Sequence, residues 1–170
     1  MSTFIYIQTV DTGLAPCVYQ RIWSLALCKP TIRRRASEGD IIIAVTPAKD
    51  GHKLSSWGKS ERRVTTEEFS REYSKSRPDN IYEMLPNGRY ARRHGVKHYM
   101  HMADLEHDLG KNGESAFVLI ARDFFAFGKD AVKHRDWLHR LPQLQKEIKE
   151  LGRSFRRNFD SGVDKELKQL

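Results

Sequence analysis

Two short apolar runs constrain the fold of this chain more than any other feature. Residues 41–45 and 115–121 are almost continuously apolar, and each run has the length of a β-strand rather than of a helix. Such runs are typical of strands that are buried on both faces, so we expect both runs inside a sheet. Residues 3–10 are rich in β-branched and aromatic side chains and predict a further strand.

Helices are expected at three places. Residues 18–27 carry apolar side chains at a spacing that suits a short buried helix, which Pro30 would end. Residues 65–68 match a capping box and predict a helix of about two turns. Apolar residues recur every three to four positions over residues 137–155, which predicts an amphipathic C-terminal helix from about Leu141. Because strands and helices do not alternate regularly, the expected fold is α+β, with a compact and mostly antiparallel sheet.

The length of 170 residues bounds the domain organisation. It suits one domain, which we expect over residues 1–133, followed by a helical tail over residues 134–170 that packs on the domain or on a partner. No apolar run approaches the ~20 residues that span a bilayer, and the first residues do not resemble a signal peptide. We therefore expect a soluble, cytoplasmic protein without a membrane partner, whose two cysteines are free thiols.

The charge of the chain favours an anionic partner. Lys and Arg number 30 against 22 Asp and Glu, which gives a net charge of +8. Residues 51–100 contribute +5 of this, from eleven basic and six acidic residues. Nucleic acid, with DNA favoured over RNA, or a nucleotide is the partner that this balance indicates.

Candidate binding residues follow from side-chain chemistry. Arg33 and Arg34 could hold phosphates, although a solvated basic loop explains them equally well. Asn80 could read a base edge and Tyr82 could stack on a base; the alternative is an Asx-turn followed by a core tyrosine. The full nucleic-acid-binding set that we predict is Lys29, Arg33, Arg34, Trp57, Asn80, Tyr82, Arg92, Arg93 and Phe127.

Catalytic candidates are fewer and carry no strong motif. The chain has no phosphate-binding glycine loop, no nucleophile elbow and no His-Glu-x-x-His sequence. Cys28 precedes a lysine, which would favour its thiolate, but a buried structural thiol explains it as well. The candidate catalytic residues are Asp11, Cys28, His98 and Asp79.

Four histidines cluster near two aspartates. They are His94, His98, His101 and His107, with Asp104 and Asp108. If this segment is helical or sharply turned, several of these side chains would share one face and could hold a metal; otherwise they are solvated or structural. We assign no metal ligand and no cofactor from the sequence.

Six segments in order and spacing carry a family resemblance. They are residues 11–17, 28–33, 39–43, 66–69, 79–82 and 124–128. Together they resemble the nucleotide modification associated domain 2 family of bacteria and phages, over roughly residues 3–132. The resemblance implies a component of a system that modifies nucleotides or DNA bases. The turn at Gly39-Asp40 before an apolar strand is also similar to the small PUA and EVE domains, which bind modified bases or RNA.

Three functions follow as hypotheses. The first is a nucleic-acid or nucleotide-binding domain that recognises a modified or flipped base, held in an aromatic slot ringed by arginines. The alternative is an enzyme that acts on a nucleotide or DNA base. The third is an interaction protein whose C-terminal helix docks a base-modifying enzyme or a second copy in a homodimer.

Overall fold

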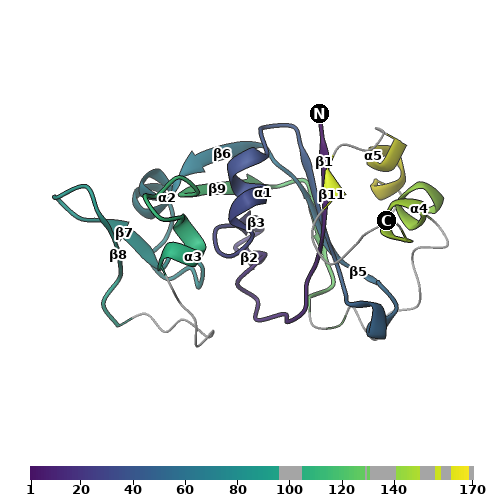
Figure 1. Ribbon diagram of the computed structural model, residues 1–170, viewed down its shortest axis with the longest axis horizontal. Helices are drawn as coiled ribbons and strands as arrows, with labels where there is room; N and C mark the ends of the chain where they lie inside the picture. The colour runs from purple at the N-terminus through teal and green to yellow at the C-terminus, as the bar shows by residue number, and fades with distance from the viewer. Residues whose placement is uncertain (96–104, 129, 131–140, 150–155, 158–161, 169–170) are drawn as a thin grey trace. The chain divides into compact units, whose positions relative to one another are not determined.

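The computed structural model describes residues 1–95, 105–128, 130, 141–149, 156–157 and 162–168 (Figure 1). The fold is α+β, as predicted, with short helices and strands in three sheets. The chain divides into two compact units. Unit 1 comprises residues 1–11, 37–61 and 121–170, and unit 2 comprises residues 12–36 and 62–120.

Unit 1 is built on a five-stranded sheet with the order β10-β5-β4-β1-β11. Its strands are β1 (Thr3–Ile7), β4 (Ile41–Val45), β5 (Leu54–Lys59), β10 (Phe124–Ala126) and β11 (Arg156–Arg157), and η1 (Ala48–Asp50) precedes β5. Strand β4 pairs in parallel with β1 and antiparallel with β5. Every residue of β4 is buried, which confirms the strand predicted from its continuous apolar run.

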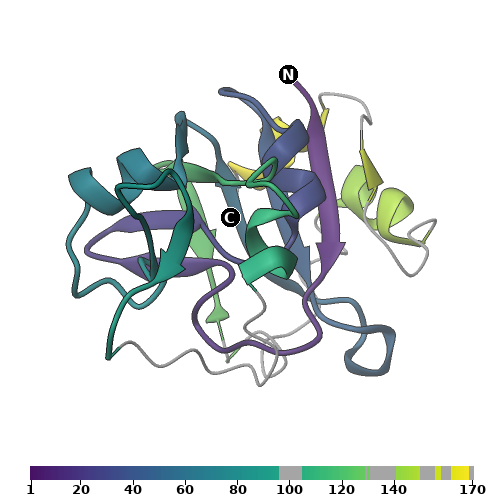
Figure 2. The ribbon, with the colours of Figure 1, turned by 60° about the vertical axis from the view of Figure 1, so that its left-hand side comes forward.

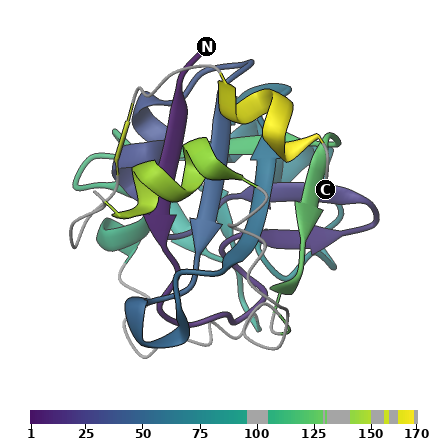
Figure 3. The same ribbon diagram turned by 90° about the vertical axis from the view of Figure 1, so that its right-hand side faces the viewer.

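Two helices cover the sheet of unit 1. Figure 3 shows α4 (Pro142–Lys149) and α5 (Gly162–Leu167) over one face of this sheet. Leu141, Leu144 and Ile148 join the core that Ile43 and Trp57 form with other sheet residues. The apolar stripe of α4 is thus buried against the sheet of unit 1. Its apolar character is therefore explained without a docking partner. The predicted extension of this stripe to Phe155 lies outside the described residues.

Unit 2 contains a four-stranded sheet with the order β2-β3-β9-β6. Its strands are β2 (Cys17–Tyr19), β3 (Ile22–Leu25), β6 (Arg62–Thr65) and β9 (Phe117–Ala121). Strand β9 confirms the second strand predicted from a continuous apolar run. The predicted helix over residues 18–27 is wrong, because these residues form the β2–β3 hairpin. Gln20 and Arg21 turn it with φ of 49° and 61°, the pair of positive φ angles that a tight hairpin turn requires.

The other described elements of unit 2 are short helices and a hairpin, which can be followed in Figure 2. These are α1 (Pro30–Arg35), α2 (Thr66–Glu72), α3 (Leu105–Leu109) and the paired strands β7 (Tyr82–Met84) and β8 (Tyr90–Arg92). Pro30 begins α1 instead of ending a helix, since proline is well suited to the first helical position. The capping box is confirmed: Thr65 Oγ1 accepts from the Glu68 N–H at 3.1 Å, and Glu68 Oε2 accepts from the Thr65 N–H at 2.7 Å.

None of the helices in the described part of the chain has the length and apolar character that crossing a bilayer would need. The strand predicted at residues 97–102 and the histidines His98 and His101 lie outside the described residues.

Candidate functional site

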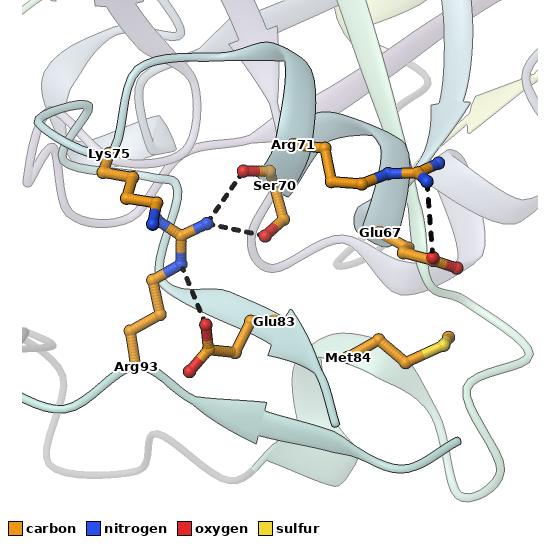
Figure 4. A pocket seen from close by; sticks show the side chains of 7 residues that line it. All are labelled: Glu67, Ser70, Arg71, Lys75, Glu83, Met84 and Arg93. Atoms are coloured by element: carbon orange, nitrogen blue, oxygen red, sulfur yellow. Dashed lines mark hydrogen bonds and ion pairs between the residues drawn. The ribbon is translucent and has the colours of Figure 1, made fainter. Parts of the chain in front are cut away.

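A polar pocket of about 390 Å³ lies in unit 2 between α2 and the β7–β8 hairpin (Figure 4). This volume is within the range of small-molecule sites. The pocket is lined by Glu67, Ser70, Arg71, Lys75, Glu83, Met84 and Arg93. Three of these side chains are cationic and two are carboxylates, so the lining carries a small positive excess.

Local structure explains why these residues meet. Glu67, Ser70 and Arg71 are spaced three and four apart on α2, which places them on one helix face. Glu83 lies on β7, where its side chain and that of Tyr82 point to opposite faces of the hairpin. Arg93 follows β8, and its backbone N–H donates to the carbonyl of Ile81 at 2.8 Å.

Arg93 is the most constrained side chain of the pocket. It is only 8% exposed, and its Nη2 donates to the Ser70 carbonyl at 2.9 Å and to Ser70 Oγ at 2.6 Å. Its Nε lies 4.0 Å from Glu83 Oε2, too far for a hydrogen bond. Nε and Nη1 are buried and have no hydrogen-bond partner in the described part of the chain. Buried guanidinium N–H groups without acceptors are costly, so an anion that displaces the side chains covering this corner would be stabilised there.

The other charges of the pocket are exposed, as at Arg71 and Lys75, or half-buried, as at Glu67 and Glu83. Arg71 Nη1 lies 3.9 Å from Glu67 Oε1, and the two side chains are 69% and 41% exposed, so this ion pair contributes little to stability. Figure 4 shows Lys75 and Arg93 on the same side of the pocket. A phosphate there would have a fork-shaped guanidinium and a mobile ammonium as donors, the combination that proteins use for phosphate.

A buried ion pair holds the segment between α2 and β7. Arg77 Nε donates to Asp79 Oδ1 at 3.0 Å, and the two side chains are 2% and 0% exposed. Ser24 Oγ on β3 accepts from Arg77 Nη2 at 2.5 Å and donates to Asp79 Oδ2. This network therefore ties the loop that carries Lys75 to the β2–β3 hairpin.

The thiol of Cys17 lies beside this network. Burial raises its pKa to about 12, and the Asp79 carboxylate adds to the rise. An unfolded cysteine loses its proton near pH 8.5, whereas the folded one keeps it. Protons are therefore lost on unfolding above that pH, and Cys17 makes the protein less stable as pH rises toward 12.

We predict that replacing Cys17 flattens the alkaline loss of stability. Between pH 9 and 11, the free energy of unfolding of the wild type should fall more steeply than that of Cys17→Ala, by up to about 1.4 kcal/mol per pH unit. Urea denaturation at several pH values measures both slopes, and other alkaline groups cancel in the comparison. Parallel slopes for the two proteins would contradict the assigned thiol pKa.

A second polar cluster lies on the other side of β7. Asp108 on α3 is 2% exposed; its Oδ1 accepts from the Cys28 N–H at 2.8 Å and its Oδ2 from the Tyr82 hydroxyl at 2.8 Å. Arg33 is fully buried and donates to the carbonyls of Cys28, Ser115, Phe117 and Asp108. Burial raises the pKa of the Cys28 thiol, and the Asp108 carboxylate raises it further. In this setting Cys28 is a protonated thiol rather than a ready nucleophile.

The predicted catalytic residues belong to different units, and one lies outside the described residues. Asp11 belongs to unit 1, and Cys28 and Asp79 belong to unit 2. Within unit 2, Asp108 lies beside Cys28, whereas Asp79 pairs with Arg77. His98 lies outside the described residues. A catalytic role for these four residues stays a prediction.

The predicted binding residues also have varied environments. Arg93 lines the pocket. Trp57 lies in the core of unit 1, and Phe127 in the same unit stacks edge-on against Phe125. The remaining six are in unit 2: Arg33, Asn80 and Tyr82 are buried, Lys29 is half-buried, and Arg34 and Arg92 are exposed. Among the described residues, no aromatic side chain lines the pocket of Figure 4.

Sequence reasoning missed five polar residues of this pocket. They are Glu67, Ser70, Arg71, Lys75 and Glu83. The helical spacing behind the capping box would have placed Ser70 and Arg71 on one face with Glu67. Nothing in the sequence indicates that β7 lies opposite that face, because this contact depends on the tertiary fold.

The protein is thus a small α+β protein with a polar pocket whose lining has more cationic than anionic side chains. The sequence profile of nucleotide modification associated domain 2 matches residues 1–168, so the chain belongs to that family. The name of the family suggests involvement in systems that modify nucleotides. The match confirms the resemblance and extends it through the C-terminal helices. Comparisons with curated proteins and with solved structures find no match. The likeness to PUA and EVE domains stays a prediction.

Proposed function

We propose that this chain is a nucleotide- or nucleic-acid-binding domain of a base-modification system, and that the pocket between α2 and the β7–β8 hairpin holds a phosphate of its ligand. The observation that carries the proposal is Arg93. This guanidinium is buried at the pocket, held by Ser70, and keeps N–H groups without acceptors in the described part of the chain. A phosphate offers acceptor oxygens and the opposite charge in one group.

The distribution of charge supports the same proposal. Unit 2 holds fifteen of the thirty Lys and Arg but only nine of the twenty-two Asp and Glu, so it carries +6 of the net charge of +8. Such an excess attracts polyanions and speeds their association. The family supports a nucleotide as the source of the phosphate.

Recognition of a modified or flipped base is the finer part of the proposal. The carboxylates of Glu67 and Glu83 at the pocket accept hydrogen bonds, and base amino groups and sugar hydroxyls donate them. Met84 adds an apolar, adaptable side chain beside them. These groups could distinguish bases beyond a shared phosphate.

A salt-titrated binding assay tests the proposal. Fluorescently labelled DNA duplexes, with and without hypermodified bases, are titrated with the protein at increasing salt, and anisotropy gives the affinity. Each neutralised phosphate contributes about −0.9 to the slope of log K against log salt, so two or three contacts give a slope of about −2 to −3.

The outcomes separate the parts of the proposal. Affinity that does not change with salt would contradict phosphate binding. A preference for modified bases that persists at moderate salt would support base recognition. Salt-dependent binding without a base preference would remove base recognition and leave phosphate binding.

A further inference from the structure

We propose that Cys28, His107 and Asp108 form a binding site for a zinc ion. One ligand atom from each side chain lies within 4.8 Å of the other two. The residues come from two segments about eighty positions apart, the loop before α1 and helix α3. The site is separate from the phosphate pocket and does not depend on the proposed function.

The spacing of the three groups suits a tetrahedral ion after a small adjustment. Zinc bonds of about 2.0–2.3 Å place neighbouring ligand atoms about 3.3–3.6 Å apart. His107 is exposed, so its imidazole can rotate toward the other two groups at little cost. Cys28 is half-buried and Asp108 is buried, and their positions are fixed by the fold.

The carboxylate of Asp108 is already oriented. The Tyr82 hydroxyl and the Cys28 N–H donate to its two oxygens, both at 2.8 Å. Arg33 anchors the same turn by donating to the Asp108 carbonyl. Such partners of metal ligands commonly set the ligand orientation and raise metal affinity.

The donor set identifies the class of ion. A thiolate, an imidazole and a carboxylate suit zinc, whereas magnesium and calcium prefer oxygen ligands alone. Three protein ligands leave a fourth tetrahedral position for water or a substrate atom, which is the pattern of catalytic zinc sites. Zinc coordinates the thiolate, so binding releases the Cys28 proton to solvent and should strengthen as pH rises.

Cobalt titration tests the proposal in the full chain. The protein is treated with chelator, freed of it, and titrated with Co²⁺; a thiolate-to-cobalt charge-transfer band should grow to one equivalent and vanish when Zn²⁺ is added. Cys28→Ser should abolish the band, and His107→Ala should weaken zinc binding at least about tenfold. His107→Ala removes an exposed side chain, so it tests the site even if Cys28→Ser fails to fold.

Matched controls are available within unit 2. Cys17→Ala removes the other thiol, and His94→Ala removes another exposed histidine; both should leave the cobalt spectrum and the zinc affinity unchanged. Cobalt binding without a thiolate band would overturn the proposal. So would zinc affinity that is the same in the wild type and His107→Ala, or stoichiometric binding that does not weaken at low pH.

Discussion

Arg77→Met should destabilise the protein by about 3–5 kcal/mol, the largest single effect that we expect on folding. The substitution leaves the Asp79 carboxylate, which is 0% exposed, without the guanidinium that donates to it at 3.0 Å and 3.3 Å. It also removes the donor to Ser24 Oγ. Urea denaturation followed by circular dichroism gives the free energy of unfolding.

An exposed pair provides the control for this prediction. Arg62 lies 3.0 Å from Glu72 with both side chains nearly half exposed, so Arg62→Met should cost less than about 1 kcal/mol. The double variant Arg77→Met with Asp79→Leu should regain much of the loss, because neither charge is then buried alone. An Arg77→Met protein as stable as Arg62→Met would contradict the view that this network holds the α2–β7 loop.

Arg93→Gln should weaken the binding of a nucleotide phosphate by about 10–100-fold, the largest effect that we expect on function. Hydrogen bonds from a charged group contribute about 1.5–3 kcal/mol each, and one such loss gives this change in Kd. Isothermal titration with a nucleoside monophosphate measures it. Because Arg93 also holds Ser70, the fold of the variant is checked by its urea midpoint.

Two further positions, Lys75 and Glu83, test the same pocket without removing the Arg93 guanidinium. Lys75→Ala should lower the affinity about two- to fivefold, and Lys111→Ala, which removes an exposed charge of the same unit outside the pocket, should not. Glu83→Gln should raise the affinity for inorganic phosphate by a similar factor, because it removes the carboxylate 4.0 Å from the Arg93 guanidinium and this ligand has no base or sugar for that carboxylate to bind. Weaker binding of inorganic phosphate by Glu83→Gln, or equal effects of Lys75→Ala and Lys111→Ala, would contradict phosphate binding here.

Local sequence signals predicted the elements that depend on local chemistry. The apolar residues of β4 fix a strand whichever partners it pairs with, and the box formed by Thr65 and Glu68 starts α2 through its own hydrogen bonds. The apolar residues that follow Leu141 at intervals of three to four positions predicted α4 in the same way. In each case the determining residues lie within one element.

The β2–β3 hairpin depends on pairing that local sequence signals do not show. Its turn uses Gln20 and Arg21 at positive φ, where glycine or asparagine is the usual signal, so the sequence lacked the common mark of a tight turn. The apolar residues of the two strands then resembled one face of a helix. Tertiary pairing overrode this local pattern.

The environments of the candidate functional side chains depend still more on tertiary structure. Arg33 and Tyr82 have the chemistry of nucleic-acid contacts, yet one donates to four backbone carbonyls and the other to Asp108. Arg93 was identified by its charge, but its burial against Ser70 was not. Composition predicted an anionic partner, while only the fold could bring α2 opposite β7 and define the pocket.

The most direct test of the central claim is a crystal structure of the protein with a nucleoside monophosphate. Phosphate oxygens should lie within hydrogen-bonding distance of the Arg93 guanidinium and the Lys75 ammonium, between α2 and β7. A nucleotide bound elsewhere at full occupancy, with this pocket holding only solvent, would contradict it.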